Sequence, residues 1–311
     1  MDPRFEILIN PPQEVFEQAV NMQSLTEDWA YQMGDYKFWS ESFDKFWLLT
    51  VVEKDTREFV ASHSVARWDA ENDEPLYSLA FYYCVPKYRG TGVASLISKM
   101  SWEIAGDHNC HGFGEVSMVD KYAQRHGLDK IADPTHMFSS LNCSDVVVKE
   151  TLSKEYSTKI WTDVDYEALT AYDLTICPRN RKEMMRHCFK LADTFTRVVL
   201  NSAGTIVGYA TIRLVTKNKL SAAPFYADNL ETAEVLLRDL LTDIPNWEGY
   251  ANIGFFYPDT NKDLLRLLNR FARAEGLIFT CEAAKSQFTK KFIPSSDQKV
   301  YAVSDGAHQF V

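Results

Sequence analysis

The sequence predicts an α/β protein with two lobes. Three observations support this prediction. The length of 311 residues favours two domains over one. Strand and helix signals alternate along the first half of the chain. The order hairpin, strand, helix, strand, helix, Gly-Leu also occurs twice, ending once at Gly127-Leu128 and again at Gly276-Leu277. We therefore expect two diverged copies of one domain.

The first half begins with strands and one helix. The apolar run at residues 5–9 predicts a short strand, and residues 13–30 can form a helix. Residues 46–52 and 59–66 alternate as two strands around a polar turn. Residues 77–85 are rich in aromatic and β-branched side chains on both faces, so we expect this strand at the centre of its sheet.

A helix and a second strand follow Pro86. Apolar residues over 93–104 recur at helical spacing and form one stripe; they are Val93, Leu96, Ile97, Met100 and Ile104. Residues 112–119 predict a strand. Residues 121–126 predict a short helix that ends at Gly127.

The domain boundary is expected where apolar anchors are few. Residues 149–159 are polar and charged, so we place a linker there, between domains at residues 1–148 and 160–311. In the second domain, residues 195–200 and 206–215 predict a hairpin. Two apolar stripes predict helices, one from Ala233 to Leu240 and one from Leu264 to Phe271.

Composition excludes several classes of partner. The net charge of −10 argues against nucleic acid and against anionic membranes as partners. The start of the chain does not resemble a signal peptide, and no apolar run approaches the length of a membrane span. The six cysteines form no C-x-x-C pair. We expect reduced thiols, a cytoplasmic location and no structural metal.

The segment Arg89-Gly90-Thr91-Gly92-Val93-Ala94-Ser95 carries the chemistry. It follows a buried strand and opens a helix, where backbone N–H groups lack partners and the helix dipole is positive. A pyrophosphate suits such an end. The two glycines let phosphate oxygens approach the backbone. The segment lacks the Gly-Lys-Ser/Thr of a P-loop and the third glycine of the dinucleotide fingerprint.

These residues resemble the acyl-coenzyme-A motif of the GNAT family of N-acetyltransferases, in Arg89, Gly92 and Ala94. The lead-in, an apolar strand end followed by Pro86 and Tyr88, is also similar to the family pattern. The resemblance implies mixed, mainly antiparallel sheets flanked by helices. It implies that the backbone of residues 89–95 holds the pyrophosphate of acetyl-coenzyme A, and that Cys84 and Val85 pair with the pantetheine arm.

The implied activity is direct transfer of an acyl group, expected to be acetyl, to a small-molecule amine. Two alternatives remain open. One is a non-catalytic protein of the same fold that binds acyl-coenzyme A. The other is a nucleotide-dependent oxidoreductase.

The second lobe is expected to be degenerate. Its equivalent loop, residues 223–231, contains neither glycine nor arginine, and Asp228 and Glu231 would repel a pyrophosphate. We expect coenzyme A in the first lobe only.

Tyr122 is the predicted catalytic acid, because the family often uses a tyrosine on this helix to protonate the thiolate. It lies five residues before Gly127, whereas the usual spacing is four and falls on Ala123. As bases, His63, Glu115 and Asp120 are candidates, each with a structural alternative. No residue is assigned as the general base.

Two further clusters of polar residues are candidate binding sites. Residues 107–111 contain metal-ligand types, but they are too compact for zinc spacing, and we expect a polar loop. The second lobe contains Asp173 and a basic cluster. These residues could bind an anionic acceptor or form a solvated helix face; the basic members are Arg179, Arg181, Lys182 and Arg186.

Overall fold

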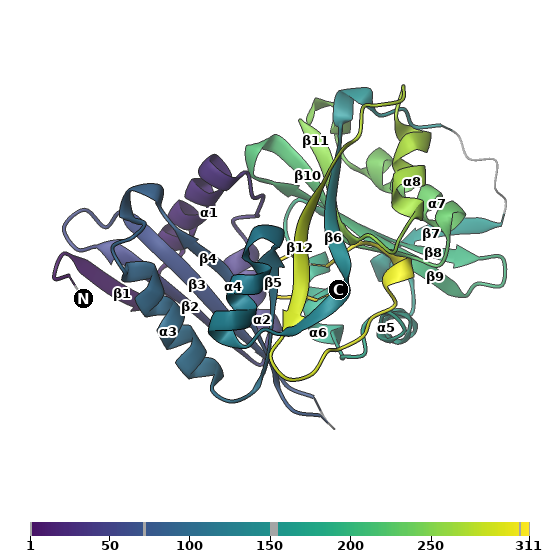
Figure 1. The fold of residues 1–311 in the computed structure, drawn as a ribbon. Helices are drawn as coiled ribbons and strands as arrows, with labels where there is room; N and C mark the ends of the chain where they lie inside the picture. Colours follow the sequence, from purple (N-terminus) through teal and green to yellow (C-terminus); the bar gives the residue numbers. More distant parts are fainter. Residues whose placement is uncertain (1, 71–72, 150–154, 305, 311) are drawn as a thin grey trace.

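The computed structural model describes residues 2–70, 73–149, 155–304 and 306–310. Strands of both halves of the chain form one continuous sheet that runs through two lobes (Figure 1). The first half contributes the strands β1 (Phe5–Ile9), β2 (Lys45–Glu53), β3 (Phe59–Trp68), β4 (Leu76–Cys84), β5 (Asn109–Glu115) and β6 (Lys130–Asn142). Its helices are α1 (Gln13–Glu27), α2 (Asp35–Ser42), α3 (Val93–Ala105) and α4 (Val119–His126).

The second half repeats this order and adds a short strand at its end. Its strands are β7 (Tyr156–Ile160), β8 (Thr194–Asn201), β9 (Ile206–Val215), β10 (Lys219–Ala227), β11 (Asn252–Pro258), β12 (Phe279–Phe288) and β13 (Val300–Ala302). Its helices are α5 (Tyr166–Leu174), α6 (Lys182–Phe189), α7 (Leu230–Asp243) and α8 (Asp263–Phe271).

The two halves exchange a strand. The sheet order is β1-β2-β3-β4-β5-β12-β6-β11-β10-β9-β8-β7. Strand β12, from the second half, lies antiparallel between β5 and β6. Strand β6, from the first half, pairs antiparallel with β11. The mixed, mainly antiparallel architecture is confirmed, and neither half of the chain contains a complete sheet.

Strands β4 and β5 pair in parallel over a short stretch only. Residues 76–78 lie opposite residues 109–111. The β3–β4 register then shifts, so that Phe81 and Tyr82 together oppose His63. Phe81 has a positive φ of 53°, as one residue of such a bulge can. Since β4 bends at this point, β4 and β5 separate beyond the paired residues and leave a gap.

The two lobes share one apolar core. Phe16 and Trp39 of the first lobe belong to the same buried cluster as Met185 and Phe189 of the second. The buried carboxylate of Asp35 pairs with Arg213, which also lies in the second lobe. A second core lies beneath α7 and α8. The shared core and the exchanged strands hold the two lobes together as one body.

Most elements predicted from the sequence are confirmed, including the hairpins β2–β3 and β8–β9 and the helix α3. Two predicted elements differ. Strand β5 ends at Glu115, and residues 116–118 form a 3₁₀ turn. Of the expected linker, residues 156–159 belong to the edge strand β7, and residues 150–154 lie outside the described residues. Among the helices that the structure describes, none is both long enough and apolar enough to cross a bilayer.

Candidate active site

The glycine-rich loop connects β4 to α3. One 3₁₀ turn, Pro86–Tyr88, follows the strand. Gly90 and Gly92 then take positive φ values of 83° and 88°, a conformation that favours glycine, and the space beside both Cα atoms is open. Helix α3 begins at Val93, and no side chain caps its first turn. The loop therefore offers uncapped amides to a ligand, which is the arrangement that binds phosphate groups.

Arg89 holds this loop against two neighbouring segments. Its Nε donates to the carbonyl oxygen of Cys84 at 3.0 Å. Its guanidinium also pairs with Glu27, at the end of α1, at 2.5 Å. The guanidinium lies 5.9 Å from the ring centre of Tyr83. In this structure the Arg89 side chain fixes the loop through Cys84 and Glu27.

A cavity of about 590 Å³ extends from the loop into the gap between β4 and β5. Six of the nine residues predicted to bind the cofactor line it. These are Cys84, Arg89, Gly90, Gly92, Ala94 and Ser95. The cavity joins the uncapped end of α3 to the interior of the sheet.

The other three predicted residues face elsewhere. The Thr91 hydroxyl donates to the carbonyl of Tyr88 at 2.7 Å. Val85 and Val93 are buried in the core. The amide of Val85 donates to the carbonyl of Val60 in β3 at 2.9 Å. A ligand that runs along the open edge of β4 can therefore use the backbone of Cys84, and the expected pairing with Val85 is revised accordingly.

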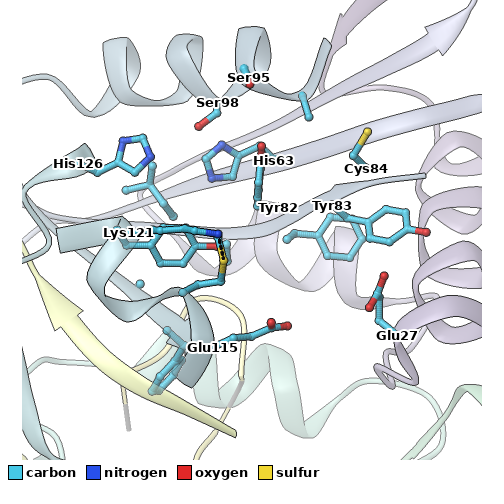
Figure 2. Close-up of a pocket in the computed structure, with 18 of the residues that line it drawn as sticks. Glu27, His63, Tyr82, Tyr83, Cys84, Ser95, Ser98, Glu115, Lys121 and His126 are labelled. Carbon is cyan, nitrogen blue, oxygen red and sulfur yellow. Dashed lines mark hydrogen bonds between the residues drawn. The ribbon is translucent and has the colours of Figure 1, made fainter. Parts of the chain in front are cut away.

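Tyr122 lies on α4 and lines the cavity. Figure 2 shows two other residues of α4, Lys121 and His126, below Ser95 and Ser98 of α3. Burial is the main cause that raises the pKa of its phenol to about 12, and the nearby Glu115 carboxylate adds to the effect. Within the described chain no residue bonds to its hydroxyl. Ala123, at the position that the family spacing favours, does not line the cavity. Tyr122 is thus a protonated phenol directed toward the ligand space.

His63 lines the cavity at the point where β3 faces the bulge in β4. Its side chain is 5% exposed, and Nδ1 has no hydrogen-bond partner among the described residues. Its ring packs edge-on against Tyr82 at 5.1 Å. Burial, with a smaller contribution from His126, lowers the pKa of His63 to about 3, so the imidazole is neutral at pH 7.

A stacked pair of rings lines the cavity. Trp102 of α3 and His126 of α4 lie 4.8 Å apart and 8° from parallel. Both line the cavity, and burial lowers the pKa of His126. Sequence reasoning missed both residues, because the contact joins two helices separated by a strand. The only local signal was that each residue lies on a predicted amphipathic helix.

The C-terminal segment forms part of the opposite wall, which the sequence did not indicate. Gly306 and Ala307 line the cavity. The next residue, His308, is buried, with Nε2 2.9 Å from Ser64 Oγ and Nδ1 3.2 Å from Ser78 Oγ. Residues that follow β13 in the second lobe therefore complete the site in the first.

The corresponding gap in the second lobe is filled. Strands β10 and β11 also pair in parallel over a short stretch, residues 220–222 with 253–255. Beyond that stretch β13 pairs with β10, with Phe225 opposite Ala302. The helix that follows, α7, is capped by its own Asn229, whose side chain accepts from the amide of Thr232 at 2.9 Å. A protein strand and a protein cap thus occupy the positions that are open in the first lobe, and a coenzyme A site in the first lobe only stays a prediction.

The two other clusters have structural roles. Residues 109–111 belong to β5 and not to a loop, so neighbouring side chains point to opposite faces. No group of metal-binding side chains occurs in the ranges that the structure describes.

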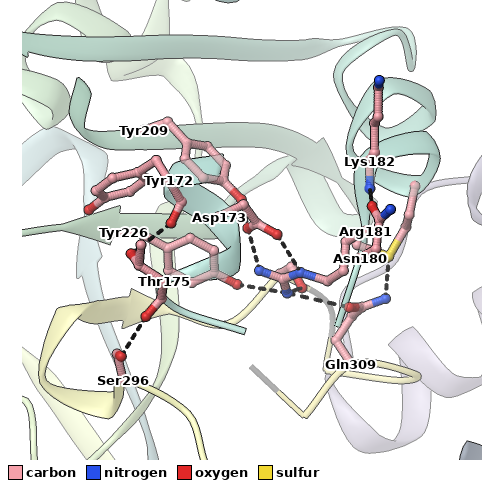
Figure 3. A network of polar contacts seen from close by, with 12 residues as sticks. Tyr172, Asp173, Thr175, Asn180, Arg181, Lys182, Tyr209, Tyr226, Ser296 and Gln309 are labelled. Atoms are coloured by element: carbon pink, nitrogen blue, oxygen red, sulfur yellow. Dashed lines mark hydrogen bonds and ion pairs between the residues drawn. The ribbon is translucent and has the colours of Figure 1, made fainter. Parts of the chain in front are cut away.

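Asp173 and Arg181 form a fully buried ion pair at 2.6 Å, to which Tyr209 donates (Figure 3). Arg179 is also buried, and it donates to the carbonyl of Glu74. The expectation that these three residues form a solvated helix face is wrong, because all three are buried. Asp173 and Arg181 bond within the second lobe, and Arg179 connects that lobe to the first. Lys182 and Arg186 pair with surface glutamates.

Comparison with known proteins identifies two matching family models. The model described as "Protein of unknown function (DUF1248)" matches residues 3–176, which is more than half of the chain. The model described as "Acetyltransferase (GNAT) domain" matches residues 169–300. The sequence likeness to a GNAT domain therefore lies in the lobe whose gap is filled, while the open cavity lies in the other.

The chain is similar to one protein in sequence and to several solved structures in fold, each over most of its length. "Uncharacterized protein F36G3.2" of Caenorhabditis elegans is 27% identical over 72% of this chain and 75% of its own length. A solved structure of "A Putative Acetyltransferase" from Pyrococcus horikoshii superposes with a TM-score of 0.69 at 12% identity, over 99% of this chain and 97% of that one. A tandem GNAT protein from the clavulanic acid biosynthesis pathway gives a TM-score of 0.63 at 12% identity, over 93% and 99%. The fold is that of a tandem GNAT protein.

Proposed function

The chain belongs to the family described as "Protein of unknown function (DUF1248)" and has a tandem GNAT fold, and we propose that it is an acyl-coenzyme-A-dependent N-acyltransferase. The expected donor is acetyl-coenzyme A and the expected acceptor is a small-molecule amine. One observation carries the proposal. A single cavity connects the uncapped N-terminus of α3 with the gap between β4 and β5, and it continues to the far side of the sheet.

The first lobe offers a position for each part of the cofactor. The amides at the start of α3 and the open glycine positions suit the pyrophosphate. The backbone of Cys84, at the open edge of β4, suits the amides of the pantetheine arm, which would bind as an added strand. The thioester would then lie farther inside the gap, on the side of the cavity that Tyr122 lines.

The proposed reaction needs no metal. The amine nitrogen attacks the thioester carbonyl, a C–N bond forms and the C–S bond breaks. The departing thiolate takes a proton, and the amine loses one. Because its pKa is raised to about 12, Tyr122 remains protonated at neutral pH and can supply the proton to the thiolate.

The matching family model and structures support the N-acyltransferase class, but they do not identify the amine acceptor. A GNAT acetyltransferase domain matches the second lobe, and solved structures with the same tandem fold are described as N-acetyltransferases, for example one from Sphaerobacter thermophilus with a TM-score of 0.58 at 12% identity. The alternative is a protein of the same fold that binds acyl-coenzyme A without turnover. Thermal stabilisation and free-thiol release separate the two.

The test compares coenzyme A with nicotinamide dinucleotides in a thermal-shift assay, and then measures thiol release from acetyl-coenzyme A with a panel of amines. We expect coenzyme A to raise the melting temperature strongly, nicotinamide dinucleotides to leave it unchanged, and at least one amine to release thiol. Stabilisation without release for any amine would favour the non-catalytic alternative. If coenzyme A does not raise the melting temperature, the loop at residues 89–95 is not a coenzyme A site.

A further inference from the structure

The two faces of the central strands divide the cavity into two sides. Side chains of β5 alternate, so Gly112 and Gly114 face α4, where a Cβ at Gly114 would meet the ring of Tyr122 at 3.1 Å. By the same alternation, Phe113 and Glu115 of β5 face the opposite side of the sheet. The α3–α4 side carries the cofactor features described above. The opposite side, which we call the acceptor side, is therefore where the amine must enter.

Aromatic rings line much of the acceptor side. The contributors are Trp29, Tyr31, Phe81, Tyr83 and Phe113. Their neighbours hold several of these rings in place. Tyr31 packs edge-on against Phe81 at 5.2 Å, and Phe113 packs against His136 at 4.7 Å and Phe256 at 5.1 Å. Gly306 and Ala307 add a small, apolar part of the wall.

The ionisable groups on the acceptor side include two carboxylates. Figure 2 shows Glu27 and Glu115 directed toward the same part of the cavity, below Tyr83 in the view. Glu27 is paired with Arg89 at 2.5 Å. Glu115 has no ion pair or hydrogen bond within the described ranges. Lys121 and Arg125 of α4 also line the cavity, and the Nζ of Lys121 lies 3.7 Å from the sulfur of Met118.

We infer that the acceptor is a primary amine that is cationic at neutral pH and has an aromatic or apolar body, with its ammonium group received by Glu115. A free carboxylate beside aromatic rings favours a cation, because the carboxylate supplies the opposite charge and the ring faces add a cation–π attraction. An anionic acceptor would place its charge next to the unpaired carboxylate of Glu115. This inference rests on the proposed transferase function and narrows its substrate class.

The test measures thiol release from acetyl-coenzyme A with tryptamine, phenethylamine, glucosamine and glutamate as acceptors. We expect the two arylalkylamines to have the highest kcat/KM, and glutamate to be the poorest acceptor. Glu115→Gln should raise the KM for tryptamine about tenfold or more, while the KM for acetyl-coenzyme A stays within about twofold.

Asp120, a candidate base in the sequence, is an exposed acid on the first turn of α4 and does not line the cavity. Glu103→Gln is the matched control, because Glu103 is an exposed glutamate of α3 that also lies outside the cavity lining. It should leave both KM values unchanged. Preference for glutamate or glucosamine, or an unchanged tryptamine KM in Glu115→Gln, would overturn the inference. If coenzyme A stabilises the protein and no arylalkylamine binds or reacts, the inference fails while the cofactor site stands. If coenzyme A itself does not bind, the proposed function fails.

Discussion

The imidazole of His308 lies within hydrogen-bond distance of the Ser64 hydroxyl, at 2.9 Å, although the two residues are far apart in the sequence. Ser64 belongs to β3 of the first lobe, whereas β13, a few residues before His308, lies in the sheet of the second. Between these two attachments lie Gly306 and Ala307, which line the cavity. The second lobe thus supplies part of the acceptor side, even though its own gap is filled.

Replacing His308 should weaken binding of the amine acceptor more than binding of acetyl-coenzyme A. His308→Ala leaves the hydroxyls of Ser64 and Ser78 without their imidazole partner, which should cost about 1–3 kcal/mol of stability. We expect a lower melting temperature and a raised KM for the amine, with the KM for acetyl-coenzyme A nearly unchanged. Steady-state kinetics and thermal unfolding measure these effects. His187→Ala, in a half-buried residue of α6, is the control, and equal amine KM values in the two variants would contradict the role of the segment.

The glycine loop can be tested with a pair of substitutions that carry the same backbone strain. Gly92→Glu places a carboxylate where the pyrophosphate is expected, and we predict that the affinity for coenzyme A falls about 100-fold or more. Gly204→Glu is the matched control. Gly204 lies in the β8–β9 turn and also has a positive φ and open space beside it. Isothermal titration with coenzyme A measures both, and wild-type affinity in Gly92→Glu would refute the loop assignment.

If Tyr122 protonates the thiolate, replacing it should lower kcat and leave the affinity for coenzyme A unchanged. Tyr122→Phe keeps the ring and removes the proton donor, so kcat should fall about 10- to 100-fold while the affinity for coenzyme A stays within about twofold. Tyr250→Phe, in a half-buried tyrosine beneath the second core, should change neither quantity. In the wild type, kcat should show no falling limb from about pH 6 to about pH 10, because the pKa of Tyr122 is raised to about 12. Unchanged kcat in Tyr122→Phe would assign the proton to another donor.

Buried histidines predict how stability depends on pH. Burial lowers the pKa of His63, His111, His136 and His308 to about 3 in the folded protein. An unfolded histidine takes up its proton near pH 6.5, so the unfolded state binds more protons between these values and stability falls as pH falls through this window. Each such group contributes a slope of about 1.4 kcal/mol per pH unit.

The corresponding measurement is the melting temperature from pH 7 down to about pH 4. We expect a steep decrease below pH 6.5. His111→Asn should make the decrease shallower, because it removes one of the groups that must stay neutral among Ser286 and Phe288. A melting temperature that is level across this range would show that these imidazoles are solvated.

Patterns within single short segments of the sequence predicted those elements whose conformation depends on neighbouring residues. The stripe from Val93 to Ile104 gave α3, and the Pro86-to-Ser95 pattern gave the loop whose open amides border the cavity. Tyr122 was found by its position relative to Gly127, and the structure places it in the cavity. These features depend on residues within a few turns of one another, so one segment contains the whole signal.

Features that depend on distant partners could not be predicted in this way. Strand β6 contains Asp133-Pro134, and much of β12 is polar, so neither has the alternation of an isolated strand. Their place in the sheet follows from pairing between the two halves. The burial of Arg181 likewise depends on Asp173 meeting it across a turn in a closed core. The Gly306-Ala307-His308 segment has no local signal, because its role comes from a site built by the other lobe.

The exchanged strand β12 also limits the order in which the molecule can be made. The edge of β5 is completed by residues 284–288, and the edge of β6 by residues 252–258 and 279–288. A ribosome that has released only the first half of the chain has therefore released a sheet with bare edges. The first lobe cannot complete its sheet until almost the last residues have been synthesised, so a chain that ends early lacks a strand beside β5 and β6.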